Sequence, residues 1–235
     1  MRASGRRLMS NLLWVGLPYL AIAVFVVGHV WRYRRDRFDW TDEWMQLLKP
    51  RKARWGIVLF HAGTLAVIAG HVLGILVPPR LTAYVGIGEA QYRVLAVLLG
   101  GLFGVCVLVG LGGLLWRRTM VAQIVANTTW VDRVTLGLIA IVVVLGMVAT
   151  LGVNLFGGGY DYRSTVAVWF RSILLLSPRP ELVASAPLIY QVHAVAAWLL
   201  VMIWPFSRLV HAWYFPFYFR RRVLELRRSL PLRRA

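Results

Sequence analysis

The chain has 235 residues, of which 59% are hydrophobic and only 15% are charged. A soluble domain is nearer half apolar and a quarter charged, so this composition excludes an ordinary cytosolic globular protein, and it is far too apolar for a disordered one. The net charge of +18 comes from 27 Lys and Arg against 9 Asp and Glu. Because these charges lie between long apolar runs, we interpret them as membrane-topology signals and expect no nucleic-acid partner.

Five apolar runs are long enough to cross the hydrocarbon core of a bilayer, which takes about 20 helical residues. A bilayer interior cannot hydrogen-bond free backbone groups, so each run is expected to be a helix. The runs cover residues 11–31, 55–77, 94–116, 131–156 and 187–217. The sequence therefore predicts an all-α fold: a single transmembrane domain over residues 1–235, built as a bundle of five spanning helices.

The link between the fourth and fifth runs is long. Three consecutive glycines at 157–159 open it, and three prolines lie near its end. Between them, a stretch of mixed apolar and basic residues predicts a short helix at about 164–176, lying on the outer membrane surface.

The basic residues predict the orientation of the bundle. Of the 27 Lys and Arg, 19 lie in the segments 32–54, 117–133 and 208–234, which emerge on one side. By the positive-inside rule the N-terminus is outside and the C-terminus is in the cytoplasm, in a multi-pass protein of the bacterial or archaeal cytoplasmic membrane. We expect the segment 32–54 and the basic tail 218–235 to contact a partner subunit, or the tail to contact lipid.

Four of the five histidines lie in two of the predicted helices. His61 and His71 are in the second, His193 and His211 are in the fifth, and His29 ends the first. Ionisable side chains inside a membrane are costly and therefore indicate function. Because the two helices run antiparallel, His61 should lie level with His211, and His71 level with His193. Eighteen residues make five helical turns, so the two histidines of the fifth helix should share one face.

Two bis-histidine sites in an apolar bundle suit two b-type haems, because haem iron accepts one imidazole on each axial side. Small residues beside the ligands, including Gly63, Gly70 and Gly74, would leave room for the macrocycle. The single cysteine, Cys106, excludes a disulfide framework, an iron–sulfur cluster and a Cys-based zinc site within this chain alone. The alternative is that each histidine only hydrogen-bonds within the bundle, and this is the preferred interpretation for His29.

Two stretches resemble the respiratory nitrate reductase gamma subunit. Trp55-Gly56-Ile57-Val58-Leu59-Phe60-His61 followed by Gly70-His71 resembles its second helix, and the Pro-Phe-Ser-Arg-Leu-Val-His run at 205–211 resembles the end of its last helix. The resemblance extends over essentially the whole chain. It implies a di-haem cytochrome b that oxidises menaquinol or ubiquinol. Electrons would pass to an iron–sulfur subunit and then to a molybdenum catalytic subunit that reduces nitrate.

The resemblance also implies roles for individual residues. His61 and His211 would bind the proximal haem near the cytoplasm, and His71 and His193 the distal haem beside the quinol site. The candidates for the quinol site are Gly70, Glu89, Gln91 and Arg93, although the family lysine falls on or near Gln91, which is a departure. Arg208 is a candidate for contacting a haem propionate. The residues around Glu89 also fit a plain interfacial belt of polar and aromatic side chains.

Two other functions remain open at this point. The chain could be a related membrane cytochrome b of another reductase complex, sulfite-reductase-linked or heterodisulfide-type. It could instead be a cofactor-free membrane assembly or transport protein, although the helices lack acidic transport residues and broken-helix pairs. A visible spectrum separates this last class from the other two.

Overall fold

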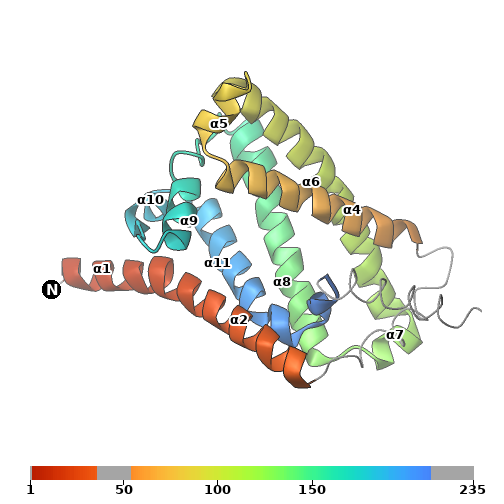
Figure 1. Cartoon of the computed structure of the whole chain (residues 1–235). Coiled ribbons are helices and arrows are strands. Elements are labelled where there is room, and N and C mark those ends of the chain that lie inside the picture. Colours follow the sequence, from red (N-terminus) through yellow and green to blue (C-terminus); the bar gives the residue numbers. More distant parts are fainter. Residues whose placement is uncertain (1, 36–53, 213–235) are drawn as a thin grey trace, which may run out of the picture.

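The computed structural model describes residues 2–35 and 54–212, and within these ranges it contains helices and turns but no strand. The first helix is continuous through α1 (Arg2–Asn11), η1 (Leu12–Gly16) and α2 (Leu17–Arg35). The following elements, in chain order, are α4 (Arg54–His71), η3 (Val72–Leu76), α5 (Pro79–Tyr84), α6 (Glu89–Met120), α7 (Ala122–Ala126), α8 (Trp130–Met147), η4 (Val148–Phe156), α9 (Val166–Leu174), α10 (Pro180–Ala184), α11 (Leu188–Ile203), η5 (Trp204–Phe206) and η6 (Arg208–Val210). Figure 1 shows their arrangement.

Five helical stretches are long and apolar enough to cross a membrane, as the sequence predicts. They are Leu8–Arg35, Trp55–Leu76, Glu89–Met120, Trp130–Phe156 and Leu188–Phe206. Many of their large apolar side chains point outward; Leu65 is 69% exposed and Leu98 is 63% exposed. So much contiguous apolar surface would be unfavourable in water and is suited to lipid.

The fifth span differs from the prediction of one helix over 187–217. α11 ends at Ile203, and two short 3₁₀ turns follow, separated by Ser207 in an extended conformation with φ −104° and ψ 176°. Pro205 ends the helix because it has no amide hydrogen to donate and restricts the residue before it. The expectation that His193 and His211 share one face of a single helix is therefore wrong, and residues 213–217 lie outside the described ranges.

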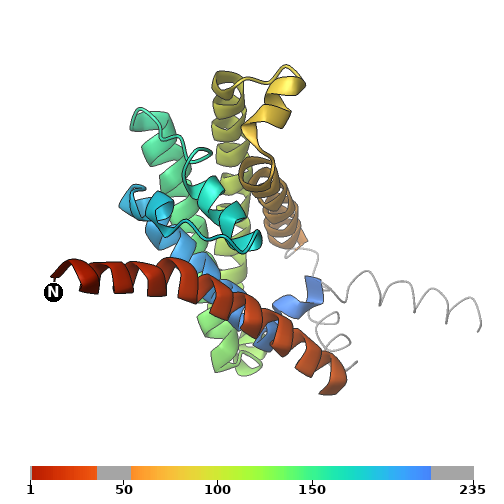
Figure 2. The same ribbon diagram turned by 60° about the vertical axis from the view of Figure 1, so that its left-hand side comes forward.

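After α11 the chain leaves the helix axis and turns toward α4, as Figures 1 and 2 both show. The carbonyl groups freed by this break are hydrogen-bonded to a buried arginine of α2. Arg32, which is 5% exposed, donates from Nη1 to the carbonyl oxygens of Pro205 at 2.7 Å and Ser207 at 3.3 Å. Gly28 lets α2 approach, since a Cβ there would lie 2.7 Å from Cβ of Pro205. Arg32 and Gly28 thus hold the break in the fifth span against α2. Without these hydrogen bonds, the free carbonyl groups would be energetically costly in lipid.

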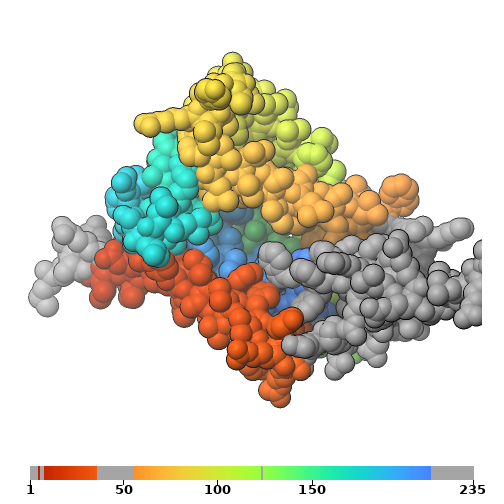
Figure 3. Space-filling model, viewed as in Figure 1, coloured from red at the N-terminus to blue at the C-terminus, as the bar shows by residue number. Residues whose placement is uncertain are grey.

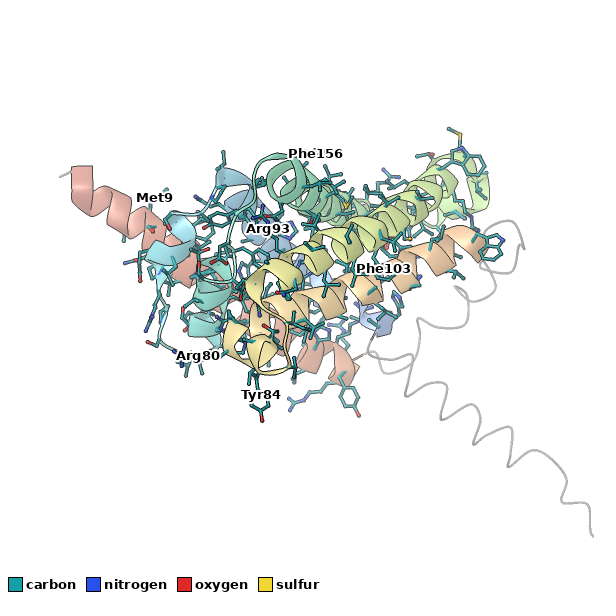
Figure 4. The ribbon with its side chains drawn as sticks, turned by 90° about the horizontal axis from the view of Figure 1, so that it is seen from above. Met9, Arg80, Tyr84, Arg93, Phe103 and Phe156 are labelled. Atoms are coloured by element: carbon teal, nitrogen blue, oxygen red, sulfur yellow. The ribbon has the colours of Figure 1, made fainter. Side chains whose placement is uncertain are left out.

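The helices α4 and α6 pack closely through glycines, and Figure 4 shows them side by side. A Cβ on Gly63 would lie 2.9 Å from Val107 and 3.0 Å from the carbonyl oxygen of Phe103. A Cβ on Gly110 would meet the backbone of Phe60 and, at 2.8 Å, the carbonyl oxygen of Gly56. Small residues at such crossings let helix backbones touch. Gly63 therefore serves the contact between α4 and α6 and is not beside the facing histidines, contrary to expectation.

The short helix expected at about 164–176 is present as α9, and it covers one end of the bundle together with α10. Its Trp169 is buried and donates from Nε1 to the carbonyl oxygen of Trp14 at 2.9 Å. The rings of these two tryptophans meet edge to face, with centroids 5.8 Å apart. Ala21, Ile173, Val183 and Trp198 complete this buried cluster, which fixes the link between the fourth and fifth spans against the first.

We predict that Gly110→Ala destabilises the protein by about 1–3 kcal/mol, because the new methyl group meets backbone atoms that cannot rotate away. The measurement is the thermal unfolding midpoint of the full chain in detergent. Gly112→Ala on the same helix is the matched control, since a Cβ there meets nothing within 4 Å. Equal effects of the two substitutions would contradict the proposed close contact.

Candidate functional site

The four histidines of the second and fifth spans form two facing pairs. The ring centroids of His61 and His211 lie 5.8 Å apart with an interplanar angle of 67°. Those of His71 and His193 lie 6.2 Å apart with an angle of 25°. These are the two juxtapositions expected from the sequence. We refer to the two ends of the bundle as the His61 end and the His71 end.

The pairs meet across a space between two groups of helices. α4 packs mainly against α6, whereas α11 packs against α8 and α2, and α4 and α11 have little backbone contact over the described residues. Figure 3 shows the corresponding recess between α4 and α2, with α11 and α8 at its floor. Imidazole rings reach into this space from both sides. The space is therefore lined by apolar helices, and the two imidazoles of each pair lie across it from one another.

Backbone hydrogen bonds orient three of the four rings. The Nδ1 atoms of His61, His71 and His211 donate to the carbonyl oxygens of Ile57 at 2.8 Å, Val67 at 2.8 Å and Arg208 at 2.6 Å. A carbonyl can only accept, so Nδ1 carries the proton in each ring. The Nε2 atoms are therefore the nitrogens with a free lone pair, as in histidines that bind metals.

His193 is positioned differently, by a glycine of α8. A Cβ on Gly146 would lie 3.2 Å from Cε1 and 3.7 Å from Nδ1 of His193. The side chain of any other residue at position 146 would therefore crowd the His193 ring. This contact was not apparent in the sequence, because Gly146 is one of many glycines in the apolar runs.

The spacing of the pairs fits an iron ion between them. An imidazole nitrogen lies about 2 Å from a coordinated first-row metal, so two coaxial rings have centroids about 6 Å apart. The observed 5.8 Å and 6.2 Å agree with this value. Within residues 2–35 and 54–212, no three His, Cys, Asp or Glu side chains gather as a metal site. Two imidazoles per site match the axial ligands of haem.

His29 shares the local hydrogen-bond geometry of His61 and His71 but has another neighbour. Its Nδ1 bonds the carbonyl oxygen of Phe25 at 2.7 Å, and the Phe25 ring lies 4.3 Å from its own. The hydrogen bond to the carbonyl of residue i−4 thus also occurs in a histidine whose neighbouring ring is a phenylalanine and not a second imidazole. This agrees with the structural role expected for His29.

A buried arginine organises the His71 end. Arg163, which is 2% exposed, pairs with Glu89 at 2.9 Å and donates to the carbonyl oxygen of Val77 at 3.2 Å and to Thr82 at 3.3 Å. Its guanidinium carbon lies 3.9 Å above the ring of Tyr92, a cation–π contact. The candidate Glu89 is therefore held by an arginine that the sequence did not single out, since an arginine in a loop resembles any interfacial charge.

Three tyrosines form a layer one helical turn beyond His71 and His193. The hydroxyls of Tyr92 and Tyr162 lie 3.1 Å apart, and both come close to Gly74, which follows His71 by one turn. Tyr190, one turn before His193, stacks on Tyr162 with centroids 6.3 Å apart. Burial, and then the hydrogen bond with Tyr92, raises the pKa of the Tyr162 hydroxyl above its ordinary value. Tyr162 thus stays protonated near neutral pH and can donate a hydrogen bond.

The remaining candidates at this end have different surroundings. Arg93 donates to the carbonyl oxygens of Gly158 at 2.6 Å and Asn154 at 3.4 Å, and Figure 4 shows it between the start of α6 and the end of η4. Gln91 folds back over Gly88, with Oε1 2.8 Å from where a Cβ would stand. Gly70 is exposed, and a Cβ there would meet no atom within 4 Å. The structure thus gathers Glu89 and Arg93 near the glycine-rich link and leaves an open surface beside His71.

At the His61 end, Arg208 is engaged by protein groups. Its Nε lies 3.0 Å from Oδ1 of Asp132, and its Nη2 donates to the carbonyl oxygen of Asn127 at 2.9 Å. A contact between Arg208 and a haem propionate stays a prediction. Asp132, at the start of the fourth predicted span, was missed in the sequence because only the fold brings it to Arg208.

The chain matches the family described as nitrate reductase gamma subunit over residues 10–229. It belongs to the nitrate reductase gamma-subunit family. It is 38% identical to the nitrate reductase gamma chain of Bacillus subtilis over 88% of this chain and 92% of that one. It is 31% identical to the respiratory nitrate reductase 2 gamma chain of Escherichia coli over 87% and 91%.

The chain is also 41% identical, over 89% of its length, to the nitrate reductase-like protein NarX of Mycobacterium tuberculosis, but it spans only about a third of that protein (32%). Gamma subunits are the membrane-anchoring cytochrome b subunits of multi-subunit nitrate reductases, and they generally bind haem. Family and spans together make this a multi-pass protein of the bacterial inner membrane.

We predict that Gly146→Val displaces the ring of His193 and reduces the haem content of the purified full chain, because the pair of His71 and His193 loses its geometry. The measurement is haem per chain by pyridine haemochrome absorbance. Gly137→Val is the control on the same helix, since a Cβ at 137 meets nothing within 4 Å. Unchanged haem in Gly146→Val would show that α8 does not position this ligand.

Proposed function

We propose that this gamma subunit holds two haems b, one between His61 and His211 and one between His71 and His193. The single observation that carries the proposal is that two pairs of imidazoles face one another across an apolar recess, with ring centroids 5.8 Å and 6.2 Å apart. Haem iron, when bound, supplies reversible one-electron transfer whose potential depends on axial ligands, nearby hydrogen bonds and burial. The backbone bonds to Nδ1 would hold the rings of three ligands and make their Nε2 atoms better donors.

The subunit would face the membrane with the His61 end toward the cytoplasm and the His71 end outward. The support is the distribution of positive charge along the sequence, since 19 of the 27 Lys and Arg fall in the segments 32–54, 117–133 and 208–234, which flank the spans on the side predicted to be cytoplasmic. We call the two pairs inner and outer on this basis. The inner pair would lie near the iron–sulfur subunit and the molybdenum catalytic subunit that reduces nitrate.

Quinol oxidation would take place at the outer end, beside His71. Oxidation of one quinol to quinone releases two electrons and two protons. The Tyr162 hydroxyl, which stays protonated, would donate a hydrogen bond to a quinol oxygen. Glu89 is 54% exposed beside Arg163 and would pass protons to the outer solution. Gly70 leaves an open approach next to the imidazole, and Arg93 supplies positive charge where this chain lacks the family lysine.

The reaction would contribute to the membrane potential because its two products leave on opposite sides. Protons would be released outside, whereas electrons would be delivered to the cytoplasmic partner subunits. Moving one charge across a membrane is worth about 2.3 kcal/mol per 100 mV. The chain's part in this would be to place the proton-accepting Glu89 and the hydrogen-bonding tyrosines at the outer end.

We expect His61→Ala and His71→Ala each to remove about half of the dithionite-reduced b-type absorbance, because each deletes an axial ligand of one site. His29→Ala is the matched control and should keep the wild-type spectrum, since the ring of His29 lies against Phe25. Ferric electron paramagnetic resonance (EPR) should show two different low-spin signals, because the ring planes meet at 67° in one pair and 25° in the other. A wild-type chain without b-type bands would refute the proposal.

Tyr162→Phe should slow reduction of the protein by a short-chain quinol analogue by about 3- to 10-fold, the effect of one lost hydrogen bond, while dithionite reduction stays unchanged. Quinol-driven nitrate reduction by the assembled complex should fall in parallel. Tyr84→Phe is the control, because Tyr84 is 91% exposed at the same end and lies outside the tyrosine layer. If both tyrosine variants behave as wild type, quinol does not contact this layer.

A further inference from the structure

His211 differs from the other three paired histidines because the chain just before it is broken into two 3₁₀ turns, although residues 211–212 are themselves helical. It follows the three-residue turn η6, which itself follows the extended Ser207. Such 3₁₀ turns are short and have poorer hydrogen-bond geometry than an α-helix. The direction of the His211 side chain, which follows these turns, therefore depends on contacts with other helices. The segment 204–211 therefore needs contacts from other helices if the ring of His211 is to face His61.

The first outside contact comes from Asp132 at the start of α8. This carboxylate is 4% exposed, and its two oxygens have separate partners. Oδ2 accepts from the backbone nitrogen of Thr129 at 2.9 Å and from its hydroxyl at 2.8 Å, which caps the helix. Oδ1 lies 3.0 Å from Nε of Arg208, and Arg118 approaches Oδ2 at 3.9 Å. One oxygen thus caps α8 while the other holds Arg208.

Arg208 in turn bears directly on the imidazole. Its carbonyl oxygen lies 2.6 Å from Nδ1 of His211, so displacement of Arg208 moves the group that orients the ring. From the opposite side, Arg32 of α2 holds the carbonyl oxygens of Pro205 and Ser207. The segment is therefore held between α8 and α2 by two buried charged side chains, Asp132 and Arg32.

We propose that Asp132 and Arg32 are positioning residues for His211, and that they set the ring direction and haem retention of the inner pair while leaving the outer pair unaffected. The proposal rests on the proposed function for its haem readouts. Neither residue would touch the haem iron. Asp132 acts through the guanidinium and carbonyl group of Arg208, and Arg32 acts through the two carbonyl groups at the helix break.

The test uses the purified full chain with three substitutions at the start of α8. Asp132→Asn removes the charge that holds Arg208, while an amide oxygen can still accept from Thr129. Thr129→Ala removes part of the helix cap and keeps the carboxylate. Arg133→Gln removes a neighbouring exposed charge on the same helix. His61→Ala and His71→Ala provide reference spectra in which one site is absent.

We expect Asp132→Asn to weaken retention of the inner haem by about 10-fold and to shift the inner EPR signal, as loss of a ligand-orienting partner does. Arg32→Gln should give the same selective change. Thr129→Ala should lower the unfolding midpoint without moving the inner signal, and Arg133→Gln should leave the haem content and both signals unchanged. Hydrogen exchange measured by mass spectrometry should speed up over residues 204–211 in Asp132→Asn but not in Thr129→Ala.

An inner signal and exchange rate in Asp132→Asn equal to those of wild type would overturn the proposal. So would a change that Thr129→Ala reproduces, because Asp132 would then act only as a helix cap. A wild-type chain that holds no haem would instead refute the proposed function. In that case hydrogen exchange over 204–211, which needs no haem, still decides whether Asp132 holds the segment. If Asp132→Asn fails to fold, Arg32→Gln provides the same comparison.

Discussion

The bilayer's inability to hydrogen-bond polar groups governs this structure. Where α11 ends early at Pro205, the freed carbonyl groups are taken up by Arg32 of a neighbouring span. At the other end of the bundle, Arg163 and Arg171 likewise bind the carbonyl oxygens of Val77 and Ile75, where the second span ends. Arginine suits this task because its planar group carries several donors and remains charged.

The same constraint accounts for the paired histidines. An imidazole in lipid needs partners for both nitrogens, and three of the four rings satisfy Nδ1 on a nearby backbone carbonyl within their own chain segment. Their Nε2 atoms then face a recess between helices, where a metal-bound macrocycle is a suitable occupant. In the proposed function, an imidazole that costs energy in an apolar bundle would bind haem iron, and this bond would offset the cost.

The two ends of the bundle differ in chemistry, and this difference supports a vectorial reaction. The outer end gathers tyrosine hydroxyls, a half-exposed carboxylate and a buried arginine, groups suited to a substrate that carries protons. The described part of the inner end holds its histidine pair with a buried aspartate–arginine contact. Paired histidines occur at both ends, whereas over residues 2–35 and 54–212 the half-exposed carboxylate and the tyrosine layer lie at the His71 end.

From the sequence alone, the five spans and the pairing of His61 with His211 and of His71 with His193 were predictable, because apolar length and antiparallel order determine depth in a membrane. The break after Ile203 was not, since Pro205 was interpreted as lying within a helix that the membrane would enforce. The roles of Arg32, Asp132, Gly146 and Arg163 depended on tertiary structure. Each acts on a residue distant in the chain, and only helix packing decides which charges and glycines meet.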